Sequence, residues 1–160
     1  MFAATIRGTQ VNDNLIGTPK DDNMDGLRGN DNMNGLLGND IIEGDQGKDV
    51  LTGGDGNDYL AGGQDEDILN GDQGNDELSG GEGRDHLFGG PGNDVLYGGI
   101  SNDILVAGEG NDRIYGGPGN DTLTGEAGGD YFDCGLGTDT VKDYNPAEGD
   151  SYSSCEILPR

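Results

Sequence analysis

The sequence predicts an all-β solenoid, in which short strands stack along a rod. Three observations predict it: a nine-residue period without insertion or deletion from residue 8 to residue 142, one apolar position fixed in every period, and a low content of apolar residues. Sequence periods of this kind are typical of solenoids, because each repeat is one small unit that stacks on its neighbours to share a core. The chain of 160 residues has the length of one domain.

The composition indicates that the chain needs a partner in order to fold. Hydrophobic residues make up 30% of it and the formal net charge is −24, values that are typical of disordered chains. The excess charge is carboxylate, and carboxylates are the ligands of hard cations, which prefer oxygen. Nucleic acid is excluded as a partner because its phosphates would be repelled. No segment reaches the roughly 18 apolar residues of a membrane span.

Two positions of the repeat hold the same type of residue in every copy. We number the positions 1 to 9, with repeat 1 at residues 8–16 and repeat 15 at residues 134–142. Position 8 is always apolar: Leu15, Met24, Met33, Ile42, Leu51, Leu60, Leu69, Leu78, Leu87, Leu96, Leu105, Ile114, Leu123, Phe132 and Val141. Position 6 is always aspartate: Asp13, Asp22, Asp31, Asp40, Asp49, Asp58, Asp67, Asp76, Asp85, Asp94, Asp103, Asp112, Asp121, Asp130 and Asp139. A glycine-rich low-complexity linker would not keep both positions in register over so many repeats.

The other positions indicate turns and strands. Glycine is frequent at positions 1, 2 and 4, where we expect the positive φ and close backbone approach of a tight turn. Asparagine, common at position 5, is the next most tolerant residue of positive φ. Positions 7 to 9 point outward, inward and outward in a strand, so the residue at position 8 is expected in the core.

Over residues 8–142 the sequence resembles the repeats-in-toxin (RTX), or hemolysin-type, calcium-binding repeat G-G-x-G-x-D-x-U-x. Residues 53–61 (GGDGNDYLA) and 116–124 (GGPGNDTLT) are clean copies. The resemblance implies a right-handed parallel β-roll of about fifteen half-coils with calcium ions in the turns. Each nonapeptide would form a six-residue turn and a three-residue strand. Two nonapeptides would form one coil, so residues 18 apart would stack.

The resemblance also implies where the ions bind. Each calcium would lie between two stacked turns, held by both aspartates and by backbone carbonyls of the glycine-rich loops. The side chains of all fifteen aspartates at position 6 are therefore expected as ligands. The expected carbonyl ligands are those of Gly53, Gly62, Gly71, Gly80, Gly89, Gly98 and Gly116. The stacked pairs allow up to about thirteen ions, whose charge would nearly cancel that of the protein. Binding and folding should then be one event.

Some repeats depart from the pattern. Repeats 1 and 2 (residues 8–25) lack the glycines at positions 2 and 4, and Lys20 adds a positive charge. They are either capping repeats without a full metal site or weak sites. Ile100 with Ser101, and Asp65 with Glu66, also disturb their turns.

The two ends are expected to differ from residues 8–142, the β-roll. Residues 1–7 form a tail and a starting half-strand, and residues 1–4 are either the remnant of a signal-peptide region or a plain start. Residues 143–160 form a C-terminal cap. Cys134 and Cys155 are about one coil apart, which favours a disulfide that fastens the cap. A disulfide points to a secreted or cell-surface protein, with Sec-type export favoured over type I secretion.

No group in the sequence suggests catalysis. The one histidine, His86, lies at an outward strand position, and no serine has a plausible base. The sequence therefore predicts a protein that is not an enzyme. It would be an extracellular structural or secretion-type module that folds on binding many calcium ions. The alternative is an adhesion or self-assembling subunit that uses an exposed apolar sheet face. That face, expected to dock a second copy or another protein, contains Val50, Ile68, Phe88, Ile104 and Val106.

Overall fold

The computed structural model describes residues 4–155, and every regular element in this range is a β-strand. The strands are β1 (Thr5–Arg7), β2 (Asn14–Ile16), β3 (Asn23–Asp25), β4 (Asn32–Leu37), β5 (Ile41–Gln46), β6 (Val50–Asp55), β7 (Tyr59–Gln64), β8 (Ile68–Gln73), β9 (Glu77–Glu82), β10 (His86–Pro91), β11 (Val95–Ile100), β12 (Ile104–Glu109), β13 (Arg113–Pro118), β14 (Thr122–Ala127), β15 (Tyr131–Leu136), β16 (Thr140–Val141) and β17 (Ser151–Ser153). No helix within residues 4–155 is long and apolar enough to cross a membrane.

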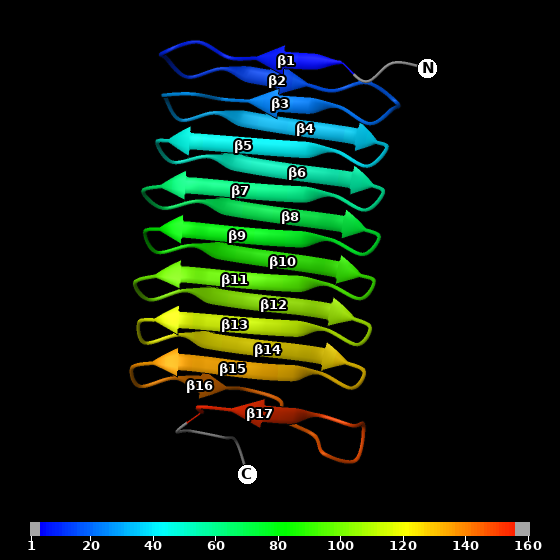
Figure 1. The fold of residues 1–160 in the computed structure, drawn as a ribbon, viewed down its shortest axis with the longest axis vertical. Helices are drawn as coiled ribbons and strands as arrows, with labels where there is room; N and C mark the ends of the chain where they lie inside the picture. The colour runs from blue at the N-terminus through cyan, green and yellow to red at the C-terminus, as the bar shows by residue number, and fades with distance from the viewer. Residues whose placement is uncertain (1–3, 156–160) are drawn as a thin grey trace.

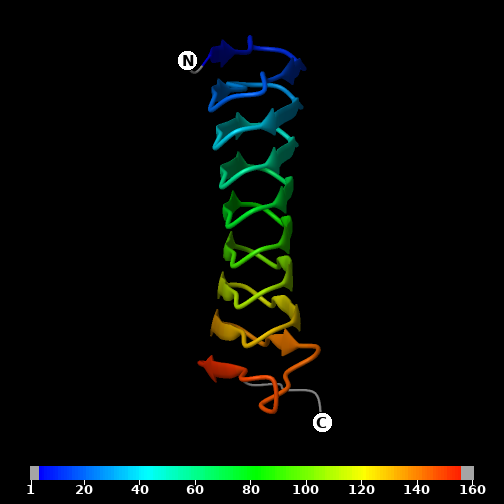
Figure 2. The same ribbon diagram turned by 90° about the vertical axis from the view of Figure 1, so that its right-hand side faces the viewer.

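The strands alternate between two parallel sheets that face each other along a rod (Figures 1 and 2). Odd-numbered strands form a nine-stranded sheet and even-numbered strands an eight-stranded sheet. Within the repeats each residue pairs with the residue 18 positions later, as Val50 does with Ile68. The predicted fold class is confirmed: the chain is a parallel β-solenoid of about eight coils.

The strands are longer than the expected three residues. From β4 to β15 each has six residues, covering positions 7 to 9 of one repeat and 1 to 3 of the next. Only positions 4 to 6 are left for each turn. Because side chains alternate along a strand, position 1 points inward as well as position 8. On β6, for example, both Leu51 and Gly53 are buried.

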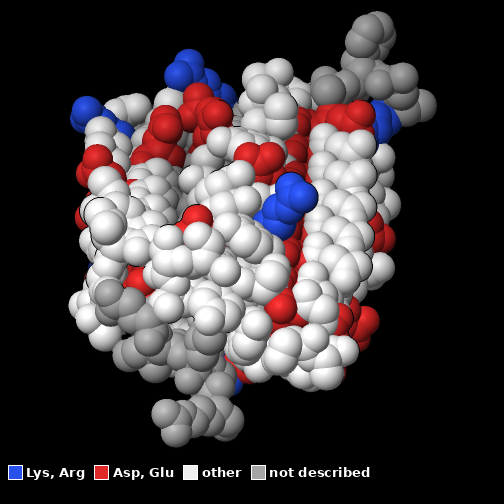
Figure 3. All heavy atoms as spheres, turned by 60° about the horizontal axis from the view of Figure 1, so that its bottom comes forward, with Lys and Arg blue, Asp and Glu red and all other residues white. Residues whose placement is uncertain are grey.

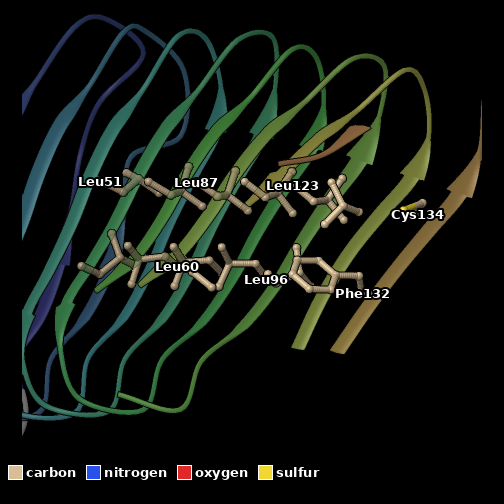
Figure 4. Packing of buried hydrophobic residues seen from close by; sticks show 14 of the residues in the cluster. Leu51, Leu60, Leu87, Leu96, Leu123, Phe132 and Cys134 are labelled. Atoms are coloured by element: carbon tan, nitrogen blue, oxygen red, sulfur yellow. The ribbon is translucent and has the colours of Figure 1, made fainter. Parts of the chain in front are cut away.

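The core is a narrow double row of position-8 side chains (Figure 4). Leu51, Leu87 and Leu123 come from the eight-stranded sheet and face a second row from the other sheet, in which Phe132 lies at the C-terminal end. Position-8 residues from Met24 to Val141 are fully buried, as the sequence predicts. One large apolar side chain per repeat makes a thin core, so each coil depends on contacts with its neighbours.

Glycine has different tasks at its three positions, and positive φ, which the sequence predicts at all three, is absent from position 1. At positions 2 and 4 most glycines have positive φ, whereas no position-1 glycine does. Position 1 needs glycine for space: a Cβ on Gly80 would lie 2.5 Å from Oδ2 of Asp85 and 2.5 Å from the carbonyl oxygen of Gly98. At position 4, Asp65 and Ser101 adopt positive φ of 78° and 103° without glycine, so the turn shape is retained in these irregular repeats.

Asparagine at position 5 also has a reason other than the expected one. No asparagine among the described residues has positive φ. Instead, the Asn75 N–H donates to Oδ1 of Asn57 (2.7 Å), 18 residues earlier. Side-chain amides thus link neighbouring coils along the turn edge. On the other edge Lys48, Glu66 and Arg84 replace three asparagines, and Lys48 Nζ lies 2.7 Å from Oε2 of Glu66.

The C-terminal segment closes the end of the roll. Cys134 and Cys155 form the expected disulfide, and β17 pairs in parallel with β15. The ring of Tyr144 meets that of Tyr152 edge-on, with centroids 5.2 Å apart. At the other end β1 is the expected half-strand, paired with β3. The proposal of a signal-peptide remnant concerns residues 1–4, of which 1–3 lie outside the described part of the chain.

The alternation on β8 can be tested with two neighbouring truncations. Leu69 is fully buried, whereas the side chain of Ile68 is 45% exposed. Leu69→Ala should lower the free energy of unfolding by about 2–5 kcal/mol, because it leaves a cavity. The control Ile68→Ala should cost less than about 1 kcal/mol. Chemical denaturation measures both, and equal losses would contradict the inward and outward assignment.

Candidate metal centres

The aspartates at position 6 form one row along each turn edge of the roll. Each aspartate ends a three-residue turn and directly precedes a strand. From Asp22 to Asp139 all of them are at most 3% exposed, while Asp13 in the first turn is half-buried. In the space-filling view, acidic residues gather in bands between ridges of uncharged atoms (Figure 3). Burying carboxylates in this way is unfavourable unless they are paired or bind metal.

One carboxylate oxygen of each aspartate joins two coils. The Asp58 N–H donates to Oδ1 of Asp76 at 2.8 Å, and the Asp76 N–H donates in turn to Oδ1 of Asp94 at 2.8 Å. The same bond recurs from Asp13 to Asp31 and on to the pair of Asp121 and Asp139. The stacking of aspartates 18 residues apart, which the resemblance implies, is therefore present.

The other oxygen, Oδ2, is buried and has no hydrogen-bond donor at twelve of these aspartates. They are Asp31, Asp40, Asp49, Asp58, Asp67, Asp76, Asp85, Asp94, Asp103, Asp112, Asp121 and Asp139. A buried polar atom without a partner is costly, and a regular series of them calls for an explanation. An ion that supplies positive charge to each Oδ2 would provide one.

Backbone carbonyls point to the same places. Oδ2 of Asp85 and the carbonyl oxygen of Gly98 in the next coil both lie 2.5 Å from the point where a Cβ on Gly80 would be. Glycine at position 1 thus leaves a small space lined by a carboxylate and a carbonyl oxygen. Oxygen ligands of these two kinds suit Ca²⁺. Within residues 4–155 no group of three or more His, Cys, Asp and Glu side chains could hold a metal, so such a site depends on main-chain oxygens.

Most of the expected carbonyls, but not all, converge with a carboxylate in this way. Six do: those of Gly53, Gly62, Gly80, Gly89, Gly98 and Gly116. The Gly71 carbonyl is the exception. A Cβ on Gly53, one coil earlier, would have only atoms of Asp58 as its three nearest neighbours, so the carbonyl oxygen of Gly71 is not among them. The carbonyls of Ala107 and Cys134 occupy the same place in their coils. The glycine pattern missed these two because a carbonyl ligand does not depend on the side chain of its residue.

Burial raises the pKa of most aspartates in the two rows. For Asp67, burial is partly offset by the hydrogen bond from the Asp49 N–H, but neighbouring carboxylates reinforce it, and the pKa rises to about 8. The pKa values of Asp94 and Asp103 rise to about 7 for the same reasons. Burial also raises to about 6 the pKa values of Asp40, Asp49, Asp58, Asp76, Asp112 and Asp121.

Asp22 is an exception. Burial acts on it too, but hydrogen bonds from the N–H groups of Thr18 and Ala4 outweigh burial, and its pKa is lowered. Donors to both oxygens already stabilise the charged form of this carboxylate, whereas an interior aspartate such as Asp76 accepts a hydrogen bond at Oδ1 alone.

Comparison with known proteins agrees with these observations. A family model described as the RTX calcium-binding nonapeptide repeat, which contains four copies, matches residues 7–42, 34–69, 43–78, 70–105, 79–114 and 106–141. Together the matches extend through all the turns from repeat 1 to repeat 15. A search of curated proteins finds no significant match to the chain.

The raised pKa values predict how metal-free protein responds to acid. An aspartate whose pKa is higher in the fold than its unfolded value of 3.8 destabilises the fold at pH above the folded pKa. It loses this effect as protons bind. In chelator, β-structure should therefore increase as the pH falls from about 8 to about 4. Far-UV circular dichroism measures it, and a metal-free roll that is most stable at pH 8 would contradict this account.

Proposed function

Because the chain belongs to the RTX calcium-binding nonapeptide repeat family, we propose that it is an extracellular structural module that folds when calcium fills its turns. The observation that carries the proposal is the series of buried Oδ2 atoms without a donor. Ca²⁺ would be held by these oxygens together with position-1 carbonyls of the following coil. The ion supplies the positive charge that no side chain provides there, and it has no catalytic role in this proposal.

The requirement for the ion follows from the two rows of carboxylates. Without metal, each interior coil would bury carboxylate oxygens with no donor, beside the carboxylates of the coils on either side. Positive φ at non-glycine residues such as Leu36 and Glu126 adds a cost of roughly 1–2 kcal/mol per residue. One large apolar side chain in nine residues contributes little against these terms and the chain entropy. Ion binding and folding should therefore be coupled.

An extracellular location is supported by two features. The Cys134–Cys155 disulfide is typical of proteins that fold in an oxidising compartment. A fold that requires many calcium ions also suits an environment rich in calcium. Folding on arrival outside the cell would let the chain remain extended during export, which is the basis for a secretion-type role.

Calcium titration of chelated protein tests the proposal directly. We expect little β-structure in chelator and a cooperative gain as calcium is added, measured by circular dichroism. Magnesium should substitute poorly because it requires a tight octahedral shell and retains its waters. Asp76→Asn should shift the transition to higher calcium, because Asp76 contacts the coils on both sides. The control Asp55→Asn changes an exposed carboxylate at position 3 and should behave as wild type. A fully folded chelated protein would reject the proposal.

A second role, self-association, is supported by one face of the eight-stranded sheet. Val50, Ile68 and Phe88 are 40%, 45% and 38% exposed, and Ile104 and Val106 beside them are half-buried. The face carries more charge than the sequence indicates, because β8 extends beyond its apolar residues to the partly exposed Asp72. Even so, the face carries few charges for a chain in which 25% of the residues are charged. Two copies would bury apolar surface against apolar surface there, so a second copy is the proposed occupant.

The pair Phe88→Lys and Ile104→Lys would place four like charges in such a dimer interface. We expect calcium-loaded wild type to form dimers at high concentration and this variant to remain monomeric, as measured by sedimentation equilibrium. The control pair Ile41→Lys and Tyr59→Lys changes exposed residues of the opposite sheet and should leave the dimer intact. A wild-type protein that stays monomeric would reject self-association through this face.

A further inference from the structure

In the first two turns, unlike in the interior ones, Oδ2 of the aspartate has a hydrogen-bond donor. Oδ2 of Asp13 accepts hydrogen bonds from the N–H of Thr9 (2.6 Å) and from its hydroxyl group (2.9 Å). Oδ2 of Asp22 accepts the N–H of Thr18 (2.5 Å), and its Oδ1 accepts the Thr18 hydroxyl (3.1 Å). In both turns the donor is the residue at position 2 of the same repeat.

The backbone φ at position 2 distinguishes these two turns from those of repeats 3 to 15. In each of repeats 3 to 15 the residue at position 2 has positive φ, whether or not it is glycine. The non-glycine residues that do so are Leu27, Leu36, Asp45, Asp72 and Glu126. Thr9 and Thr18 do not have positive φ. Positive φ is a conformation that β-branched residues avoid strongly. Their ordinary φ accompanies an N–H that is directed at the aspartate of their own turn.

At the C-terminal end, the last aspartate of one row also has a donor for its Oδ2, but a different kind of residue supplies it. The Asp130 N–H donates to Oδ1 of Asp150 at 3.0 Å, so Asp150 continues the aspartate row after a two-residue insertion. The Ser151 N–H donates to the carbonyl oxygen of Asp130 at 2.8 Å, as the residue after each stacked aspartate does in the roll. Oδ2 of Asp150 accepts the N–H of Asn145 at 2.7 Å. The cap therefore contains a sixteenth turn that the nine-residue period hides.

We infer that the turns of Asp13, Asp22 and Asp150 bind no calcium and that protein hydrogen-bond donors close three of the four ends of the two aspartate rows. The fourth end is Asp139, whose Oδ2 has no donor. An N–H directed at Oδ2 uses the oxygen that an interior turn offers to the ion, and its positive end repels a cation at the same place. The ions would then occupy the turns from Asp31 to Asp139. This inference rests on the proposed function and defines which of the expected ligands act.

Closed ends have a consequence for the whole molecule. An end turn with an exposed half-site could share an ion with the end of a second roll, and calcium would then join molecules end to end. Turns whose Oδ2 already accepts an N–H, as in Asp13, Asp22 and Asp150, offer no such half-site. The threonines also let the first coil form its turns without metal, which provides a folded end on which the ion-dependent coils can stack.

Replacing the two threonines tests the inference by gain of sites. Thr9→Gly with Thr18→Gly restores the glycine of the repeat and permits positive φ. We expect two more calcium ions per chain than in wild type, counted by native mass spectrometry. The matched control, Thr9→Val with Thr18→Val, keeps the β-branched shape and the N–H donor and should gain none. Equal ion counts in the glycine variant and wild type would count against the inference.

A second pair of variants covers the case in which the glycine variant folds poorly. Asp13→Asn with Asp22→Asn should leave the number of bound ions unchanged. Asp31→Asn with Asp40→Asn, one coil further in, should lose at least two ions. Loss of ions from the first pair would overturn the inference. Wild-type protein that binds no calcium at all would instead reject the proposed function, so the two failures are distinguishable.

Discussion

The structure depends on how one side chain divides its two oxygens. Each interior aspartate accepts a backbone N–H from the preceding coil with Oδ1, and this bond fixes the 18-residue stacking. The same geometry buries Oδ2 without a donor. The interaction that aligns the coils is therefore also the one that creates the need for positive charge. The remaining features, including glycine at position 1 and the direction of the carbonyls, keep the space beside Oδ2 open.

A thin core is compatible with this arrangement because the roll is one-dimensional. Each coil contributes two large side chains, for example Leu60 and Leu69, and contacts only the coils above and below it. Amide links between asparagines, and the ion pair of Lys48 and Glu66 that replaces them in part of the roll, add contacts of the same nearest-neighbour kind. Stability then accumulates coil by coil, and the ends need special treatment.

That treatment differs at the two ends. At the N-terminal end a threonine at position 2 keeps an ordinary φ and turns its own N–H onto the aspartate. At the C-terminal end the chain makes a two-residue insertion, and Asn145 supplies the N–H to Asp150. The disulfide of Cys134 ties this last turn to the roll. In both cases a backbone dipole takes the place that positive charge would have in an interior turn.

The sequence by itself determined the repeat, the fold class, the core residues from Met24 to Val141 and the aspartate rows, because a strict period forces equivalent residues into equivalent places. It could not determine which oxygen of each aspartate is left without a partner, since that depends on the stacking of two coils. It also expected positive φ for glycine at position 1 and for asparagine at position 5, and neither has it. Glycine at position 1 instead leaves room for the aspartate of its own turn and for a carbonyl of the next coil, and the asparagine bonds to a residue 18 positions away. Asp150 was hidden for a related reason: an insertion breaks the period, while hydrogen bonds across the coils restore the stack.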